Sequence, residues 1–201
     1  MCGPIYKRSL VKVGIVDCGG ANLNSIYYSL ERMGIETIIS GSVDELNLTD
    51  SLILPGVGSA GVVMKYLKDN NLVSYIKASS KPILGICIGM QILFEHSEED
   101  DTECLGLLDG LVKRFVPSDN EAVPHMGWNS VNCIDSYKYI DDYFYFANSF
   151  YAKSSDYEIG ETTYIDNFSS IVKKNNIVGC QFHPEKSSVA GERFLKDFLK
   201  I

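Results

Sequence analysis

The sequence contains no apolar run near the roughly 20 residues that a membrane-spanning helix needs. Its formal net charge is −8, from 18 basic and 26 acidic residues, so it lacks the basic surface with which proteins bind nucleic acid phosphates. Residues 1–10 contain Lys7 and Arg8 but no apolar segment and cleavage site of the signal-peptide kind. The sequence therefore predicts a cytoplasmic protein whose partners are neither membrane nor nucleic acid.

Histidine is scarce and closely spaced cysteine pairs are missing. The chain has three histidines, and its six cysteines include no C-x-x-C pair. A structural zinc site is thereby disfavoured, because such sites group cysteines and histidines at short spacings. The even number of cysteines would allow three disulfides, but without a secretion signal we expect reduced thiols, mostly packed as small core residues. No metal and no cofactor are predicted.

The order of apolar segments predicts the fold class. Of the 201 residues 45% are apolar, which is enough for one domain with a sizeable core. Up to residue 95, short strands alternate with helical patterns, which predicts an α/β fold: a mostly parallel sheet with helices on both faces. We expect strands at 12–17, 35–39, 51–54 and 82–87, and helices at 22–33, 59–78 and 89–95.

The second half of the chain has a different pattern. Segments 143–151, 158–164 and 177–182 have the composition of strands separated by turns, and we expect them to extend the sheet with antiparallel strands. A final amphipathic helix is expected over 190–199, and the acidic run 95–103 is expected to be a solvated loop. With no repeat or linker, the sequence predicts a single domain over 1–201, in which residues 1–10 form a flexible extension.

The segment Gly85-Ile86-Cys87-Ile88-Gly89 has the cysteine form of a nucleophile elbow, at a predicted strand-to-helix junction. An elbow holds its nucleophile on a sharp, strained turn, and flanking glycines let neighbouring backbone approach. The helix that begins here directs N–H groups at the sulfur, which favours a thiolate, and the Ile88 N–H can stabilise an oxyanion. The alternative is a buried cysteine between two turn glycines.

A thiol nucleophile needs a histidine as its base, and the chain offers three candidates. His96 lies in the acidic run and His125 has no adjacent carboxylate within 123–129, whereas His183 ends a predicted strand in the segment QFHPEKS. The proline that follows favours an extended His183, and residues two apart in extended chain point to the same side. Glu185 can then accept the second ring N–H. This segment alone would suit a surface turn, but with the elbow it predicts a Cys87–His183–Glu185 triad.

Residues 56–61 read Gly-Val-Gly-Ser-Ala-Gly, the G-x-G-x-x-G spacing of a dinucleotide-binding turn. Such a turn follows the first strand of its unit and is paired with an acidic residue about 20 positions further on. Here the turn follows the third predicted strand, and the next predicted strand, 82–87, carries no acidic residue. A dinucleotide site is therefore disfavoured.

Taken together, these segments resemble the class I, triad-type glutamine amidotransferases. The elbow and the H-P-E sequence are similar to the whole class, while LPGVGSA (54–60) and PHMGWN (124–129) resemble the glutaminase subunits of imidazole glycerol phosphate synthases. With DCGGANLNSI (17–26), the resemblance covers about residues 11–201. It implies a flavodoxin-like sheet with antiparallel additions in the C-terminal half.

The resemblance also implies a reaction. Cys87 would attack L-glutamine and form a thioester, whose hydrolysis gives glutamate, while the released ammonia passes to a cyclase subunit in a heterodimer. That subunit would make imidazole glycerol phosphate and an aminoimidazole carboxamide ribonucleotide in histidine biosynthesis. Backbone N–H groups of Val57 or Gly58, together with Ile88, would hold the oxyanion, and rotation of a loop peptide would complete this hole once the partner is loaded.

Further residue roles are implied by the same resemblance. The residues expected to hold the substrate glutamine are Gly56, Gln91, Ser149 and Phe150. The residues expected to face the cyclase are His125, Met126, Trp128, Asn129 and Lys186. One segment departs from the family pattern, since Ala147-Asn148-Ser149-Phe150 stands where Val-His-Ser-Tyr is usual. Asn148 can still donate and accept hydrogen bonds, so glutaminase activity is still expected.

Other functions suit parts of the sequence. An amidotransferase subunit that feeds another synthase, such as one that modifies a surface sugar, would use the same triad. A regulatory subunit would bind the partner without catalysis, and a cysteine peptidase on a similar sheet would need no partner. Cys2 could be the nucleophile of an N-terminal-cysteine amidotransferase, but Pro4 and a basic stretch follow it and nothing else resembles that class.

Overall fold

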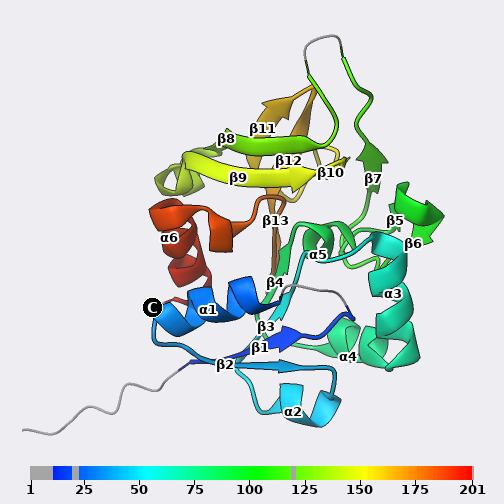
Figure 1. The fold of residues 1–201 in the computed structure, drawn as a ribbon, viewed down its shortest axis with the longest axis vertical. Coiled ribbons are helices and arrows are strands. Elements are labelled where there is room, and N and C mark those ends of the chain that lie inside the picture. Colours follow the sequence, from blue (N-terminus) through cyan, green and yellow to red (C-terminus); the bar gives the residue numbers. More distant parts are fainter. Residues whose placement is uncertain (1–10, 20–22, 119–120, 201) are drawn as a thin grey trace, which may run out of the picture.

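The structure, a computed structural model, describes residues 11–19, 23–118 and 121–200, so the predicted extension 1–10 lies outside the described residues. Within them, one sheet has nine strands in the order β2-β1-β3-β4-β13-β12-β11-β8-β9, and a second has four in the order β10-β7-β5-β6 (Figure 1). In the large sheet, the five strands β2, β1, β3, β4 and β13 run parallel. The remaining four strands, β12, β11, β8 and β9, are antiparallel. The predicted α/β fold with antiparallel additions is confirmed, although these additions form nearly half of the sheet.

The parallel strands form the buried centre of the molecule. They are β1 (Lys12–Val16), β2 (Glu36–Ser40), β3 (Ser51–Leu54), β4 (Ile83–Ile86) and β13 (Ile177–Cys180). All residues of β3 and β4 are buried, as expected for apolar strands covered on both faces. Their order, β2-β1-β3-β4-β13, is that of a flavodoxin-like doubly wound sheet.

Helices cover both faces of these strands. In Figure 1, α1 and α6 lie on one side of the parallel strands, while α3, α4 and α5 lie on the other. Their bounds, with that of α2, are α1 (Asn24–Arg32), α2 (Val43–Asn47), α3 (Ala60–Asp69), α4 (Leu72–Ala78), α5 (Ile88–Gln91) and α6 (Ser188–Leu199). Among the described residues, no helix has both the length and the apolar character needed to cross a membrane.

Three helices differ from the prediction. The helix expected over 59–78 is two helices, because Asn71 adopts a left-handed conformation with φ of 59° between them. Helix α5 ends four residues earlier than expected, since backbone N–H groups of residues 105–108 bind the carbonyls of residues 92–94 that would continue it. The short helix α2 was not predicted at all.

The antiparallel part also differs from the prediction. Its strands, with those of the small sheet that adjoin it, are β7 (Leu111–Arg114), β8 (His125–Cys133), β9 (Asp142–Asn148), β10 (Phe150–Ala152), β11 (Glu158–Tyr164) and β12 (Asp166–Lys174). Strands β7, β8 and β12 were not predicted. The strand expected over 143–151 is divided at Ser149, because β9 pairs with β8 in the large sheet and β10 pairs with β7 in the small one.

The acidic run 95–103 is not simply a solvated loop. It contains β5 (His96–Ser97), a 3-10 turn (Glu99–Asp101) and β6 (Thr102–Glu103). Glu99 Oε2 accepts the Ala60 backbone N–H at 2.8 Å, and Asp100 Oδ2 accepts the Ser59 hydroxyl at 2.5 Å. Two carboxylates thus occupy the start of α3, where a dinucleotide would need to place its phosphates. This geometry supports the exclusion of a dinucleotide site.

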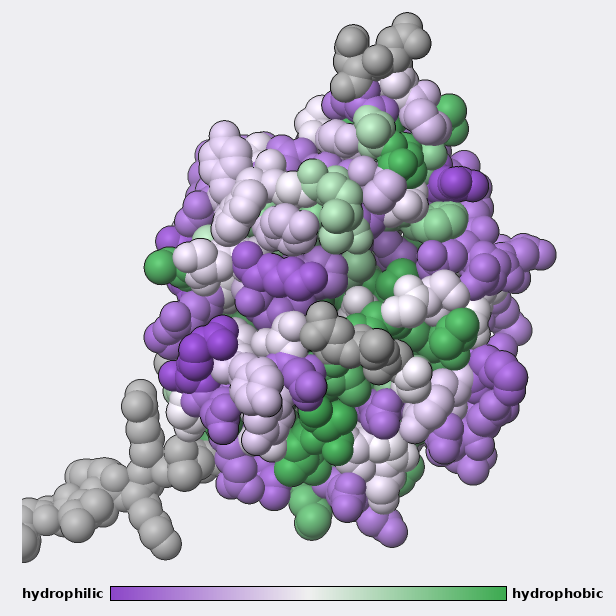
Figure 2. Space-filling view, viewed as in Figure 1, coloured by the Kyte–Doolittle hydropathy of each residue, from purple (hydrophilic) through white to green (hydrophobic). Residues whose placement is uncertain are grey.

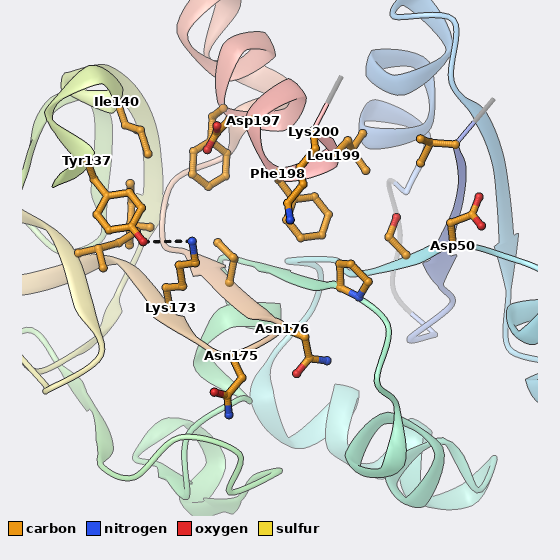
Figure 3. A pocket seen from close by; sticks show the side chains of 17 residues that line it. Asp50, Tyr137, Ile140, Lys173, Asn175, Asn176, Asp197, Phe198, Leu199 and Lys200 are labelled. Carbon is orange, nitrogen blue, oxygen red and sulfur yellow. Dashed lines mark hydrogen bonds between the residues drawn. The ribbon is translucent and has the colours of Figure 1, made fainter. Parts of the chain in front are cut away.

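A cavity of about 400 Å³ lies at the amino ends of the parallel strands, where Ser51 begins β3 and Pro82 precedes β4. Figure 3 shows Asp50, Lys173 and Asp197 around it, with the Lys173 ammonium 3.1 Å from the Tyr137 hydroxyl. In open α/β sheets, ligands bind outside the carboxyl ends of the strands. This cavity is therefore at the wrong edge of the sheet for the predicted chemistry, which lies where β4 and β13 end.

The cysteines within the described residues are free and buried, as predicted for small core residues: Cys18, Cys87, Cys104, Cys133 and Cys180. Burial is the main cause that raises the pKa of four of them, Cys18 to about 12, Cys104 to about 11, Cys133 to about 12, and Cys180 well above its usual value. These four thiols are therefore kept protonated and inert. Cys2 lies outside the described residues.

His125 is a correction to the predicted partner-facing residues. Its side chain is 4% exposed and stacks between Tyr164 and Phe146, at ring-centroid distances of 3.9 Å and 4.9 Å. Side chains alternate along a strand, so Met126 and Trp128 of β8 face outward while His125 faces the core. His125 therefore offers a partner almost no surface in this structure. Burial lowers its pKa to about 4.

This buried histidine makes folding stability depend on pH. The pKa of His125 is lower in the folded state. In the unfolded chain His125 therefore becomes protonated below about pH 6.5, whereas in the folded chain it stays neutral down to about pH 4. His125 thus stabilises the fold fully above pH 6.5 and progressively less as the pH falls. Lowering the pH from 7 to 4.5 should reduce the free energy of unfolding of both proteins. We expect this reduction to be about 2 kcal/mol smaller in His125→Phe, which retains the stacking, than in the unmodified chain. Urea unfolding at both pH values measures this, and equal losses in the two proteins would contradict it.

Candidate active site

Cys87 joins β4 to α5 in a strained backbone conformation, with φ of 51° and ψ of −111°. A residue other than glycine adopts such angles only where its surroundings enforce them. Here close packing does so: a Cβ at Gly89 would lie 1.9 Å from the Leu54 carbonyl oxygen, and one at Gly85 would lie 2.5 Å from the Gly89 carbonyl oxygen. The glycines of the predicted elbow therefore let the turn press against the end of β3.

Cys87, His183 and Glu185 lie together at the carboxyl ends of β4 and β13. His183 Nδ1 is 2.8 Å from Glu185 Oε1, and the two side chains are 9% and 4% exposed. His183 is extended, as expected, but Pro184–Lys186 form a 3-10 turn. Glu185 therefore reaches the ring through this turn and not through the extended alternation that the sequence suggested. The backbone N–H of His183 donates to the Tyr145 carbonyl at 2.8 Å and fixes the backbone from which the imidazole ring projects.

The charge of His183 is set by opposing effects. Burial disfavours the protonated ring, but the Cys87 sulfur and the Glu185 carboxylate favour it more strongly and raise the His183 pKa to about 10. His183 therefore carries a proton at neutral pH, held between a sulfur and a carboxylate. A protonated imidazole beside a nucleophilic sulfur can supply a proton to a leaving group.

A cavity of about 280 Å³ opens in front of this triad. Eight of the ten predicted catalytic, oxyanion and glutamine-binding residues line it, namely Gly56, Gly58, Cys87, Ile88, Gln91, Ser149, Phe150 and His183. Two others do not: Glu185 lies behind His183, and Val57 is not part of the lining although it lies between Gly56 and Gly58. A Cβ at Gly56 would lie 2.5 Å from Cys87 Cβ, so the loop after β3 packs directly against the elbow.

Sequence reasoning missed some of the lining. Glu99, from the supposedly solvated acidic run, contributes a half-buried carboxylate, and burial raises its pKa.

Asn148 donates from Nδ2 to the Phe150 carbonyl at 2.9 Å. Asn148 Oδ1 and Gln91 Oε1 are buried without a hydrogen-bond partner in the described part of the chain. Because both residues line the cavity, a ligand that carries N–H groups can satisfy these acceptors.

An exposed aromatic surface adjoins the cavity. Met126, which also lines the cavity, is 62% exposed and Trp128 is 53% exposed. Trp128 packs edge-on against Tyr145, and the Lys186 ammonium lies 5.9 Å from the centre of the Tyr145 ring. In Figure 2, the surface over β8 and β9 is mostly pale or light green, the colours of weakly polar and apolar residues. Asn129, predicted to face the partner, is half-buried and donates to the Thr163 carbonyl at 3.1 Å.

Comparisons with known proteins identify the family of the chain. Residues 14–201 match the family Glutamine amidotransferase class-I. The chain therefore belongs to the class I glutamine amidotransferase family. A crystal structure of a glutamine amidotransferase has the same fold, with a TM-score of 0.73 at 17% identity over 94% of this chain and 97% of that one. PurLQS from Thermotoga maritima has a TM-score of 0.69 at 20% identity, over 94% and 98%.

The curated relatives narrow the family further. The chain is 42% identical to the imidazole glycerol phosphate synthase subunit HisH of Bacteroides fragilis strain YCH46, over 95% of this chain and 100% of the relative. It is 39% identical to the HisH subunit of Idiomarina loihiensis, over 95% and 98%. Within the amidotransferases, the chain thus belongs to the HisH subunits of imidazole glycerol phosphate synthase.

The buried carboxylate behind His183 provides a test of the triad. Glu185→Gln keeps the side-chain volume but removes the charge that helps to hold the imidazole protonated. We expect kcat for glutamate release from glutamine to fall by roughly 10²–10⁴, with little change in KM. Glu192→Gln is the matched control, because Glu192 forms an exposed ion pair with Lys196 on α6. Equal kcat values for the two variants would show that Glu185 has no role in the triad.

Proposed function

We propose that this chain is the glutaminase subunit of an imidazole glycerol phosphate synthase and forms a single glutamine amidotransferase domain. The observation that carries the proposal is the Cys87–His183–Glu185 arrangement at the mouth of the 280 Å³ cavity. The identity of 42% with a HisH subunit over nearly the whole chain supports the particular synthase. The buried free thiols support a reducing compartment, the cytoplasm, as its location.

The cavity suits glutamine in size and chemistry. Glu99 is the carboxylate in its lining, and we assign it to the α-ammonium group of the substrate. The unpartnered oxygens of Gln91 and Asn148 are acceptors for substrate N–H groups. Gly56 and the backbone of Ser149 and Phe150 complete the walls. Asn148, which replaces the family's usual His, would therefore supply a hydrogen-bond acceptor for the substrate in this cavity.

The proposed reaction uses the triad twice. Cys87 Sγ attacks the side-chain carbonyl carbon of glutamine, and His183 gives its proton to the departing nitrogen, which leaves as ammonia. The resulting γ-glutamyl thioester is attacked by water, from which the now neutral His183 takes a proton. Glutamate leaves as the carbon–sulfur bond breaks and returns the sulfur to its thiolate form. Glu185 holds the ring orientation through both steps.

The negative oxygen formed in both steps needs hydrogen-bond donors. We assign one to the Ile88 backbone N–H at the start of α5 and the other to Val57 or Gly58. Gly58 has φ of 82°, a conformation that other residues adopt at a cost, so the peptide between Val57 and Gly58 can turn where a bulkier residue would resist. Rotation of this peptide when the cyclase binds would explain how ammonia release is timed.

A first experiment measures glutamate release from glutamine by the chain alone, with the cyclase subunit, and with the cyclase plus its nucleotide substrate. We expect low activity from the chain alone and a large rise in the full complex, because the oxyanion hole would be completed only there. Cys87→Ala should abolish activity in all three conditions. No rise with this cyclase, while a glutamine-analogue inhibitor still modifies Cys87, would show that another synthase is the partner.

The exposed aromatic surface is the proposed contact with the cyclase. Trp and Tyr side chains at the centre of an interface carry much of its binding energy. We expect Trp128→Ala to raise the Kd for the cyclase by roughly tenfold or more, while Cys87 in the free chain keeps its reactivity. Tyr28→Ala, at a similarly exposed position on α1, is the matched control. Titration calorimetry measures both, and equal affinities would remove this surface from the interface.

A further inference from the structure

A chain of buried amides connects the wall of the cavity to the sulfur of Cys87. Gln91 Nε2 donates to the Phe150 carbonyl and to Gln181 Oε1, each at 2.9 Å. Gln181 Nε2 in turn lies 3.6 Å from Cys87 Sγ, within the range of hydrogen bonds to sulfur. Gln181 is fully buried at the end of β13, two residues before His183. It touches the nucleophile directly although it does not line the cavity.

The polarity of this network is fixed by its first member. A carbonyl oxygen accepts only, so the Gln91 amide must turn its NH₂ group toward Phe150. The second N–H of that group then requires an acceptor in Gln181, which turns the Gln181 oxygen toward Gln91. The Gln181 NH₂ group is left to face the sulfur. Inverting either amide would oppose two donors or two acceptors inside the core.

The same orientation leaves Gln91 Oε1 as the buried acceptor without a partner in the described structure, in the lining of the cavity. One amide pair therefore links the cavity to the nucleophile. Resting on the proposed function, we propose that Gln181 is a positioning residue that stabilises negative charge on the Cys87 sulfur through its N–H donor and takes its orientation from Gln91. Hydrogen bonds to a charged atom are stronger than those to its neutral form, so this donor favours thiolate over thiol.

The competing view is that Gln181 only fills and ties the core. Its backbone N–H donates to the Ser170 carbonyl at 2.9 Å, which ties β13 to its neighbour. In this view, the side-chain hydrogen bonds of Gln181 also serve only to satisfy buried polar atoms. The two views differ in one measurable property. A structural role predicts that substitution lowers stability but leaves the ionisation of Cys87 unchanged. A positioning role predicts that the sulfur ionises at higher pH once the donor is removed.

The pH dependence of Cys87 alkylation by iodoacetamide separates these views, because the thiolate is the reactive form. The measurement uses the full chain with Cys2→Ser, and Cys87→Ala in that background gives the blank. We expect Gln181→Met, which removes both the donor and the acceptor at similar volume, to move the midpoint of the alkylation profile up by about one pH unit. Gln91→Met should move it the same way by less, because Gln181 then loses its anchor.

Asn176→Ala is the control for lost stability. The Asn176 amide donates to the Ser79 and Lys81 carbonyls at the opposite end of β13, far along the strand from Cys87. Its alkylation midpoint should not move, although its melting temperature should fall. An unmoved midpoint in a folded Gln181→Met chain, or in Gln91→Met if that chain alone folds, overturns the proposal. Because alkylation needs no glutamine, a chain that shows the shift but never hydrolyses glutamine would instead refute the proposed function.

Discussion

The strained backbone of Cys87 is the constraint on which the site depends. Its conformation costs on the order of 1–3 kcal/mol and persists because three chain segments meet around it with almost no spare volume. A Cβ at Gly56, Gly85 or Gly89 would lie within 2.5 Å of a backbone or Cys87 atom. The same contacts that hold the sulfur outward also place the Ile88 N–H and the loop after β3 beside it. The proposed nucleophile and the proposed oxyanion donors are therefore positioned by one packing arrangement.

The strand order then brings distant segments to this point. Because β3, β4 and β13 are parallel neighbours, their carboxyl ends lie side by side, although 126 positions separate Leu54 at the end of β3 from Cys180 at the end of β13. The loop after β3, the elbow after β4 and the histidine after β13 each come from one of these ends. The crossing at Ser149, from the large sheet to the small one, closes the fourth side of the cavity. The antiparallel additions thus shape the cavity and also extend the sheet as β8 and β9, which carry the exposed aromatic surface.

The sequence was informative wherever a short segment determines its own geometry. The elbow and the H-P-E turn are local patterns, and the buried runs of β1, β3 and β4 have few alternatives to a parallel sheet. Strands β8 and β12 were missed because their polar and small residues, such as HMGWNSVNC, pair only in the context of the neighbouring strands. Glu99 looked solvated because only the start of α3 gives its carboxylate a partner. The burial of His125 likewise depends on Tyr164, 39 positions away along the chain.

The electrostatics of the site follow from the same packing. A protonated His183 between a sulfur and a carboxylate, nearly excluded from water, is an expensive arrangement, since each buried ion loses its hydration. Hydrogen bonds that are fixed before the substrate arrives must offset that loss: the His183 ring N–H donates to Glu185, and the Gln181 amide donates to the sulfur. Three acceptors at this site, Gln91 Oε1, Asn148 Oδ1 and Glu185 Oε2, have no hydrogen-bond partner in the described part of the chain. Leaving such atoms without a partner costs stability, and because Gln91 and Asn148 both line the cavity, a ligand with N–H groups bound there would recover part of that cost.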